Sequence, residues 1–182
     1  NYFFERDGEI TTVKNQYKFE VKLLSATIFK VEGYGEEIYL NDHLISFQSK
    51  TLQNKKEKFV SLKLDKNKKK FNIKGSSYSG EASLKNIIGN WWSHKILQAE
   101  SQISPISGSI KEQLVTFIGK ENVAINGKEF ETDHFKLTSK DMSLPEDKRL
   151  NFDIWLDKKT LVIVKVTYER MGNWEYRLKN IE

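Results

Sequence analysis

The 182-residue chain contains no cysteine, two prolines and ten glycines, and no long hydrophobic run. Without cysteine there is no disulfide, no thiolate metal site and no cysteine nucleophile. The compartment stays open, because a cysteine-free protein works in reducing and in oxidising surroundings. The few prolines and glycines argue against long disordered linkers. A membrane helix needs roughly 20 apolar residues in succession, and the sequence offers none.

The net charge of +5 is modest but unevenly distributed, because residues 50–74 contain ten lysines against one glutamate and one aspartate. One interpretation is a surface that makes peripheral contact with anionic membrane. The other is two lysine-rich hairpin turns that keep sheet edges soluble. Arginine is scarce there and no aromatic–glycine motif accompanies the lysines, so no nucleic-acid partner is expected. The candidate anion-facing residues are Lys55, Lys56, Lys66, Lys68 and Lys69.

Much of the chain alternates between apolar and polar residues, which is typical of strands with one buried face. In residues 10–24, Val13, Tyr17 and Phe19 alternate with polar residues, mostly lysines. Turn signals recur about every eight to twelve residues, as in all-β proteins. Asn126-Gly127 is the strongest of them, because both residues tolerate a positive φ. We expect strands at residues 1–5, 10–24, 27–31, 37–40, 44–52, 58–64, 70–74, 109–118, 121–125 and 128–138, and a three-stranded meander in residues 151–182.

Two segments interrupt this pattern. Gly33-Tyr34-Gly35 predicts a bulge or sharp bend between two strands. Residues 83–99 carry apolar side chains at a period of three to four, which predicts a helical insert of one helix or two short turns, with Asn90 able to cap a second helix that begins at Trp91. The meander is predicted to turn at Asp157–Lys159 and at Met171–Asn173. With no repeat and no linker, residues 1–182 are predicted to form one β-rich domain.

The residues that could carry chemistry are scattered. His43, His94 and His134 lack the HExxH spacing of a zinc site, so no metal and no cofactor is expected. His94 is the histidine to watch, because it follows the Trp91-Trp92 pair. The carboxylate pairs Glu129/Glu131 and Asp153/Asp157 are interpreted as solvated strand faces. The protein is therefore not expected to be an enzyme, and a hydrolase that uses His94 is the weakest alternative.

The order of motifs resembles a known family. The pattern comprises the aromatic–lysine alternation around Tyr17, the Trp91-Trp92 pair, Asn126-Gly127 and a final segment from Asp153 to Leu178. It is similar to a bacterial family catalogued as domain of unknown function 6134. The resemblance implies an exported β-rich protein of the periplasm or cell envelope, with a lipoprotein-carrier-like sheet that wraps a short helical plug. The high lysine content and the short first strand depart from that pattern, and a cleaved signal or a further strand before Asn1 would be consistent with it.

These observations predict a mainly β protein, with a single strongly curved antiparallel sheet, or half-barrel, and the helical insert on its concave face. The first functional hypothesis is a non-catalytic envelope protein that binds a lipid or other apolar ligand in this concavity. The alternative is an interaction module that docks an envelope partner through a sheet edge or the basic face of residues 50–74. The candidate ligand-lining residues are Trp91, Trp92, Ile96, Leu97, Phe19 and Trp155.

Overall fold

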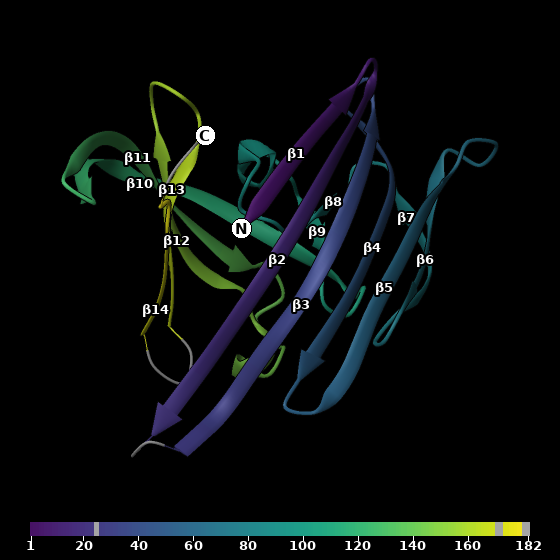
Figure 1. Cartoon of the computed structure of the whole chain (residues 1–182), viewed down its shortest axis with the longest axis horizontal. Helices are drawn as coiled ribbons and strands as arrows, with labels where there is room; N and C mark the ends of the chain where they lie inside the picture. Colours follow the sequence, from purple (N-terminus) through teal and green to yellow (C-terminus); the bar gives the residue numbers. More distant parts are fainter. Residues whose placement is uncertain (24–25, 170–172, 180–182) are drawn as a thin grey trace. The chain divides into compact units, whose positions relative to one another are not determined.

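The computed structural model describes residues 1–23, 26–169 and 173–179, and these residues are mainly β-strand. Fourteen strands in this part of the chain form two sheets of seven (Figure 1). The chain groups into two compact units, Asn1–Asn86 with Ile103–Ile110, and Ile87–Gln102 with Lys111–Glu182. The mainly β class is confirmed, whereas a single sheet is wrong because the strands pair in two separate sets. That the chain forms one domain stays a prediction.

The first sheet is a meander in which every strand pairs with the next one in sequence. Short turns make this possible, since Asn41-Asp42 and Asn54-Lys55 all have positive φ values between 47° and 67°. Two-residue turns of this kind match the twist of the strands that they join. The strands are β1 Tyr2–Asp7, β2 Ile10–Leu23, β3 Ala26–Leu40, β4 His43–Gln53, β5 Lys56–Asp65, β6 Lys70–Gly75 and β7 Ser79–Ser83.

The second sheet has the order β14-β13-β12-β11-β10-β9-β8 and curls strongly into a half-barrel, as expected for the curved sheet. A register shift between Phe117 and Gly119 interrupts the pairing of its two longest strands. Such bulges bend a strand and increase its twist. The strands are β8 Ile87–Ile88, β9 Ser101–Ile103, β10 Ile110–Ile125, β11 Lys128–Ser139, β12 Asn151–Asp157, β13 Ile163–Glu169 and β14 Asn173–Arg177.

A continuous helix over residues 83–99 is wrong, and the helical part of the insert is a single short turn. This segment holds the end of β7, the short strand β8 and the 3₁₀ helix η1, His94–Leu97. Ser93 rather than Asn90 caps η1, by accepting a hydrogen bond from the Lys95 amide. The apolar spacing reflects packing instead, because the side chain of Ile96 is fully buried in the core of the second unit. The only other helix in the described residues is the 3₁₀ helix η2, Glu146–Lys148, and neither is long enough to span a membrane.

The predicted break at Gly33-Tyr34-Gly35 is also wrong, because β3 continues unbroken through it. The register shifts of this sheet lie elsewhere, between Val21 and Lys22 and between Ile38 and Tyr39. The two glycines instead make room for side chains of β2. A Cβ atom at Gly33 would lie 2.7 Å from the Tyr17 hydroxyl oxygen, and one at Gly35 would lie 2.5 Å from Asn15 Oδ1.

Two other predictions are confirmed. Asn126 and Gly127 form the β10–β11 turn with φ values of 51° and 78°. The closing meander is present as β12, β13 and β14, each paired antiparallel with the next. The turn predicted at Met171–Asn173 falls largely on residues 170–172, which lie outside the described residues.

Alternation divides the side chains of the second sheet between two apolar clusters. The larger cluster centres on Leu137, Ile154 and Val166, with Ile96 of the insert buried in it. A smaller cluster contains Ile125, Trp155 and Val164. Ile154 and Trp155 are neighbours on one strand, so their side chains point to opposite faces of the sheet.

Candidate ligand-binding groove

An open groove of about 740 Å³ lies on the exposed face of the first sheet. Strand register explains how it forms. Gln16, Tyr34, Lys50 and Phe59 lie side by side on β2, β3, β4 and β5 and make one wall. The opposite wall is a second row of side chains, two residues further along each strand: Lys18, Glu32, Leu52 and Glu57. The walls are therefore about 7 Å apart, and the groove runs across the strands.

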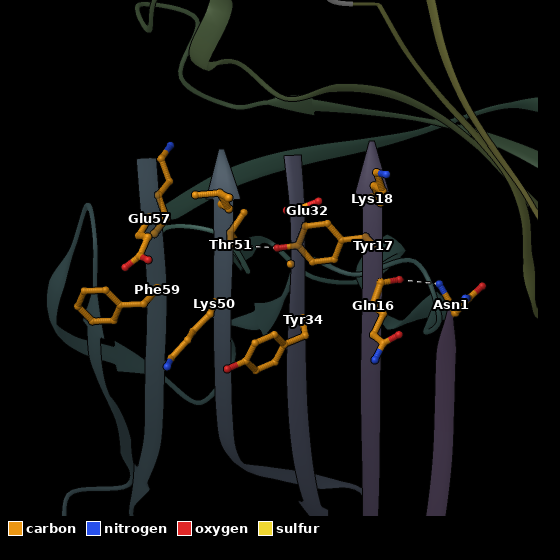
Figure 2. A pocket seen from close by; sticks show the side chains of 13 residues that line it. Asn1, Gln16, Tyr17, Lys18, Glu32, Tyr34, Lys50, Thr51, Glu57 and Phe59 are labelled. Atoms are coloured by element: carbon orange, nitrogen blue, oxygen red, sulfur yellow. Dashed lines mark hydrogen bonds between the residues drawn. The ribbon is translucent and has the colours of Figure 1, made fainter. Parts of the chain in front are cut away.

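The floor between the walls is the intervening row of residues, whose side chains point to the opposite face of the sheet. Figure 2 shows Tyr17 and Thr51 between the two rows, with the Tyr17 hydroxyl directed across β3. Tyr17 and Thr51 share a hydrogen bond of 2.5 Å, and Gly33 lies between them in the register. Burial raises the pKa of Tyr17 more than the Thr51 hydrogen bond lowers it. A neutral phenol therefore forms the back of the floor.

The first wall combines aromatic surface with positive charge. Tyr34 is 53% exposed and Phe59 is 49% exposed, on either side of Lys50. Adjacent strands lie about 4.8 Å apart, so the two aromatic residues are separated by about 10 Å across the sheet. Exposed aromatic side chains offer a large apolar contact area with little conformational freedom to lose. This row can therefore contact an apolar group while Lys50 contacts an anion.

The charges of the second wall are partly compensated. The side chains of Lys30 and Glu32 form an ion pair of 2.9 Å. This hydrogen-bonded contact raises the pKa of Lys30 and lowers the pKa of Glu32. Lys18 pairs with Glu20 at 3.4 Å. By contrast, no ion pair of Lys50 occurs within the part of the chain that the structure describes, which leaves Lys50 as the ammonium group best placed to meet a ligand anion.

Four of the residues predicted to line a cavity, Trp91, Trp92, Ile96 and Leu97, lie in the insert of the second unit. Ile96 is buried, and Trp91 and Leu97 pack against the same cluster in the second unit. The Trp91 ring makes an edge contact with Phe152 at 4.9 Å between centroids. Trp92 is half-buried beside Trp91. Their role in ligand binding stays a prediction, but these contacts are those of side chains that fill a core.

The other two predicted lining residues lie elsewhere. Phe19 belongs to β2 in the first unit, where its ring contacts Phe29 edge-on at 6.3 Å. Trp155 lies in the smaller cluster of the second sheet, on the face opposite Ile154. Because the insert and Trp155 contact different faces of one sheet, they do not enclose a common cavity.

The five candidate anion-facing lysines divide between two turns. Lys55 and Lys56 lie at the β4–β5 turn, whereas Lys66, Lys68 and Lys69 lie at the β5–β6 turn. These turns flank opposite ends of β5, whose ten residues span roughly 30 Å. Lys68 is also engaged, because its ammonium and that of Lys70 hold Glu81 at 2.8 and 2.9 Å. These hydrogen bonds lower the pKa of Glu81 to about 2. The lysines therefore form two patches rather than one face.

One polar cluster was not predicted. His134 lies between Glu121 and Asp153, with each of its ring nitrogens 2.9 Å from a carboxylate oxygen. Asp157 is 5% exposed, and its carboxylate accepts hydrogen bonds from Thr160. Interpreting Asp153 and Asp157 as solvated is therefore wrong, since both have close partners. The i, i+2 spacing of His134 with Lys136, and of Asp153 with Trp155, is the signal that could have indicated a shared face.

Among the described residues, no three histidine, aspartate or glutamate side chains are arranged to hold a metal ion. A family comparison matches residues 1–179 to the domain of unknown function DUF6134. The chain belongs to the DUF6134 family. The resemblance drawn from the motifs is thereby confirmed at the level of the family, while export and the lipoprotein-carrier architecture stay predictions. Comparisons with curated proteins and with solved structures returned no match.

Proposed function

We propose that this DUF6134 protein is a non-catalytic binding protein that holds an amphipathic, lipid-like ligand in the groove of the first sheet. The observation that carries the proposal is the wall in which Lys50 lies between the exposed rings of Tyr34 and Phe59. Ligand sites of roughly 300–1,000 Å³ with apolar walls and a few polar groups are typical of small-molecule binding. The groove volume of about 740 Å³ falls in this range.

The arrangement suggests how such a ligand would lie. Leu52 is directly opposite Glu57 in the second wall, and Lys50 is directly opposite Phe59 in the first, so each wall carries one apolar side chain on these two strands, Leu52 on β4 and Phe59 on β5. An acyl chain would contact Phe59 and Leu52, and its anionic head group would meet Lys50. Glu57 disfavours an anion at the β5 end, which supports a head group placed at Lys50 rather than beyond it.

Binding of octyl phosphate, measured by titration calorimetry below its micellar concentration, tests this proposal. Octyl glucoside, with the same chain and no charge, is the matched ligand. Lys50→Gln should weaken octyl phosphate binding about tenfold, since an exposed charge-assisted contact is worth little more. Phe59→Ala should weaken both ligands about fivefold through lost apolar contact.

Lys66→Gln, at the β5–β6 turn, is the control and should bind as the wild type does. No binding of either amphiphile would eliminate the proposal. Equal affinity for the two ligands, unchanged by Lys50→Gln, would eliminate the role given to the lysine while retaining an apolar site.

A second candidate function is docking of an envelope protein at the edge of the first sheet. It is favoured by β1, which ends the strand order and carries Phe3 and Phe4 at 50% and 57% exposure. A partner strand can pair with such an edge through backbone hydrogen bonds. Docking through a continuous basic face is less well supported, because the lysine turns lie at opposite ends of β5. A partner protein that co-purifies equally well with the wild type and with the double variant Phe3→Asp/Phe4→Asp would argue against docking at the β1 edge.

The proposal places the protein in the periplasm or cell envelope, in peripheral contact with membrane. Its support is the export that the family resemblance implies. Fractionation of cells that express the complete gene tests this location, with a cytoplasmic enzyme and a periplasmic binding protein as markers. Recovery with the cytoplasmic marker would refute it.

A further inference from the structure

The imidazole of His134 contacts carboxylates through both of its nitrogens. Nε2 lies 2.9 Å from Asp153 Oδ1 on β12, and Nδ1 lies 2.9 Å from Glu121 Oε1 on β10. Nε2 shares a hydrogen bond with Asp153, whereas Nδ1 and Glu121 form an ion-pair contact that is attractive only when both ring nitrogens carry a proton. Only the protonated ring therefore pairs with both carboxylates. In that state His134 ties β10 to β12 across its own strand.

Trp155 reports directly on this contact. Its indole N–H donates a hydrogen bond of 2.5 Å to the same oxygen of Glu121. Its ring stacks on His134 with centroids 4.4 Å apart and planes 12° apart. Lys165 lies on the neighbouring strand β13, and its ammonium is 4.3 Å from the centroid of the Trp155 ring. A change in the charge of His134 therefore reaches the indole both through the ring stack and through the shared carboxylate.

The contact lies at the base of a projecting hairpin. β11 pairs with β12 only as far as Thr132 opposite Asp157, while β10 and β11 remain paired out to Ile125 opposite Lys128. We call residues 121–131 the flap. The bulge between Phe117 and Gly119 lies just before it, and Figure 1 shows the curvature of the β10–β11 hairpin.

The flap covers the smaller apolar cluster of the second sheet. Ile125 is buried with Trp155 and Val164, and Val123 and Phe130 of the flap pack against them. Polar contacts that hold the flap include a hydrogen bond from Asn126 to the Lys179 carbonyl and one from the Lys158 amide to the Glu131 carbonyl. At its base, Glu121 contacts His134 and accepts from the Trp155 indole, and Glu131 forms an ion pair of 3.7 Å with Lys158.

The other charged groups on this face leave His134 as the proton-responsive element. Lys136 contacts Asp153 at 2.5 Å, and Lys165 pairs with Glu175, which also pairs with Arg177. The carboxylate of Asp157 is directed to Thr160. Hydrogen bonds from Lys136 and His134 outweigh the opposing effect of burial and lower the pKa of Asp153, so this carboxylate stays charged in the range where histidine titrates. Histidine is the side chain whose charge ordinarily changes between about pH 5 and pH 8.

We propose that residues 121–131 form a proton-operated flap, closed over Trp155 when His134 is an imidazolium and loosened when it is neutral. Loss of the proton removes the positive charge of the ring and leaves a ring lone pair facing one of the two carboxylates, so that one of the two ion pairs is lost. Because Asp153 is also held by Lys136, the contact to Glu121 is the one that is lost. The flap then remains attached through its packing, the indole hydrogen bond to Glu121, and the contacts of Glu131 and Asn126 with Lys158 and Lys179.

Two measurements test the flap. The indole ¹H–¹⁵N NMR signals of the four tryptophans are followed from pH 5 to pH 8, and Trp155→Phe identifies the signal of Trp155. This signal should show one transition. Amide hydrogen exchange of residues 121–131, corrected for the intrinsic pH dependence of exchange, should become about tenfold faster above the transition, the effect of one partly exposed charge-assisted contact.

His134→Gln retains a side chain of similar reach and does not titrate, so its Trp155 signal should show no transition. Glu121→Gln keeps an acceptor for the indole and should reduce the transition strongly. His43→Gln and His94→Gln are matched controls and should behave as the wild type does. A Trp155 signal that does not change in the wild type would overturn the proposal even if a variant fails to fold. A transition that persists in folded His134→Gln, or protection of the flap that is independent of pH, would overturn it as well.

Discussion

Replacing Gly33 by alanine should destabilise the first sheet by about 1–3 kcal/mol, the usual cost of overpacking. The added Cβ would lie 2.6 Å from the Lys50 carbonyl oxygen and 2.7 Å from the Tyr17 hydroxyl oxygen. The hydroxyl can move, at the expense of its hydrogen bond to Thr51. The carbonyl cannot move without disturbing the pairing of β3 with β4, so the clash has no inexpensive solution.

Thermal denaturation measures the effect. For a protein of this size, 1 kcal/mol corresponds to about 2–4 °C, so the Tm should fall by roughly 2–12 °C. Gly119→Ala is the matched control, because an added Cβ there meets no atom within 4 Å, and its Tm should stay close to that of the wild type. The double variant Tyr17→Phe/Gly33→Ala should lose less than the sum of the single variants, since both act on the same hydroxyl. A Gly33→Ala protein as stable as the wild type would refute the account of β3 as a strand that needs glycine for close packing.

Three further outcomes follow from the structure. Ile96→Ala should lower the free energy of unfolding in urea by about 2–5 kcal/mol, because its side chain is fully buried, and a loss well under 1 kcal/mol would contradict the packing of the insert. Gly127→Ala should lower it by about 1 kcal/mol, since a φ of 78° is strained for alanine, and no loss would contradict that turn geometry. Burial raises the pKa of Asp153, but hydrogen bonds from Lys136 and His134 lower it more. Its contribution to stability is therefore present above the ordinary aspartate pKa of about 3.9 and is lost as the pH falls through the lower folded value. The acid dependence of unfolding should thus be weaker in Asp153→Asn, and an unchanged profile would contradict this.

The sequence was sufficient to predict most of the longer strands, because alternation and turn chemistry are local, but the short strands β7, β8 and β9 were not predicted. The Asn126-Gly127 hairpin and the final meander depend only on residues within a few positions of each other. The number of sheets depends on which strands pair, and nothing local distinguishes one sheet of many strands from two sheets of seven. The segment from Ser83 to Ala99 was misinterpreted because burial of Ile96 against distant strands produces the same spacing as a helical face.

The groove could not be found by listing aromatic residues, since most of them pack in the core. The register of β3, β4 and β5 identifies the groove instead. Tyr34 and Phe59 are far apart in sequence, and they are brought onto one row with Lys50 by the exact lengths of two hairpins. Predicting that row requires the position of each turn to within one residue, because a shift of one residue places a side chain on the other face. The same applies to His134 and Trp155, which are opposite each other on β11 and β12.

The groove floor is a single layer of peptide backbone, backed by the Tyr17–Thr51 contact on the reverse side of the sheet. Substitutions of these two hidden side chains would therefore reshape the binding surface from behind, without altering any group that faces a bound molecule. Under the proposed function, ligand preference in homologous chains would then diverge through positions that a survey of surface residues would overlook.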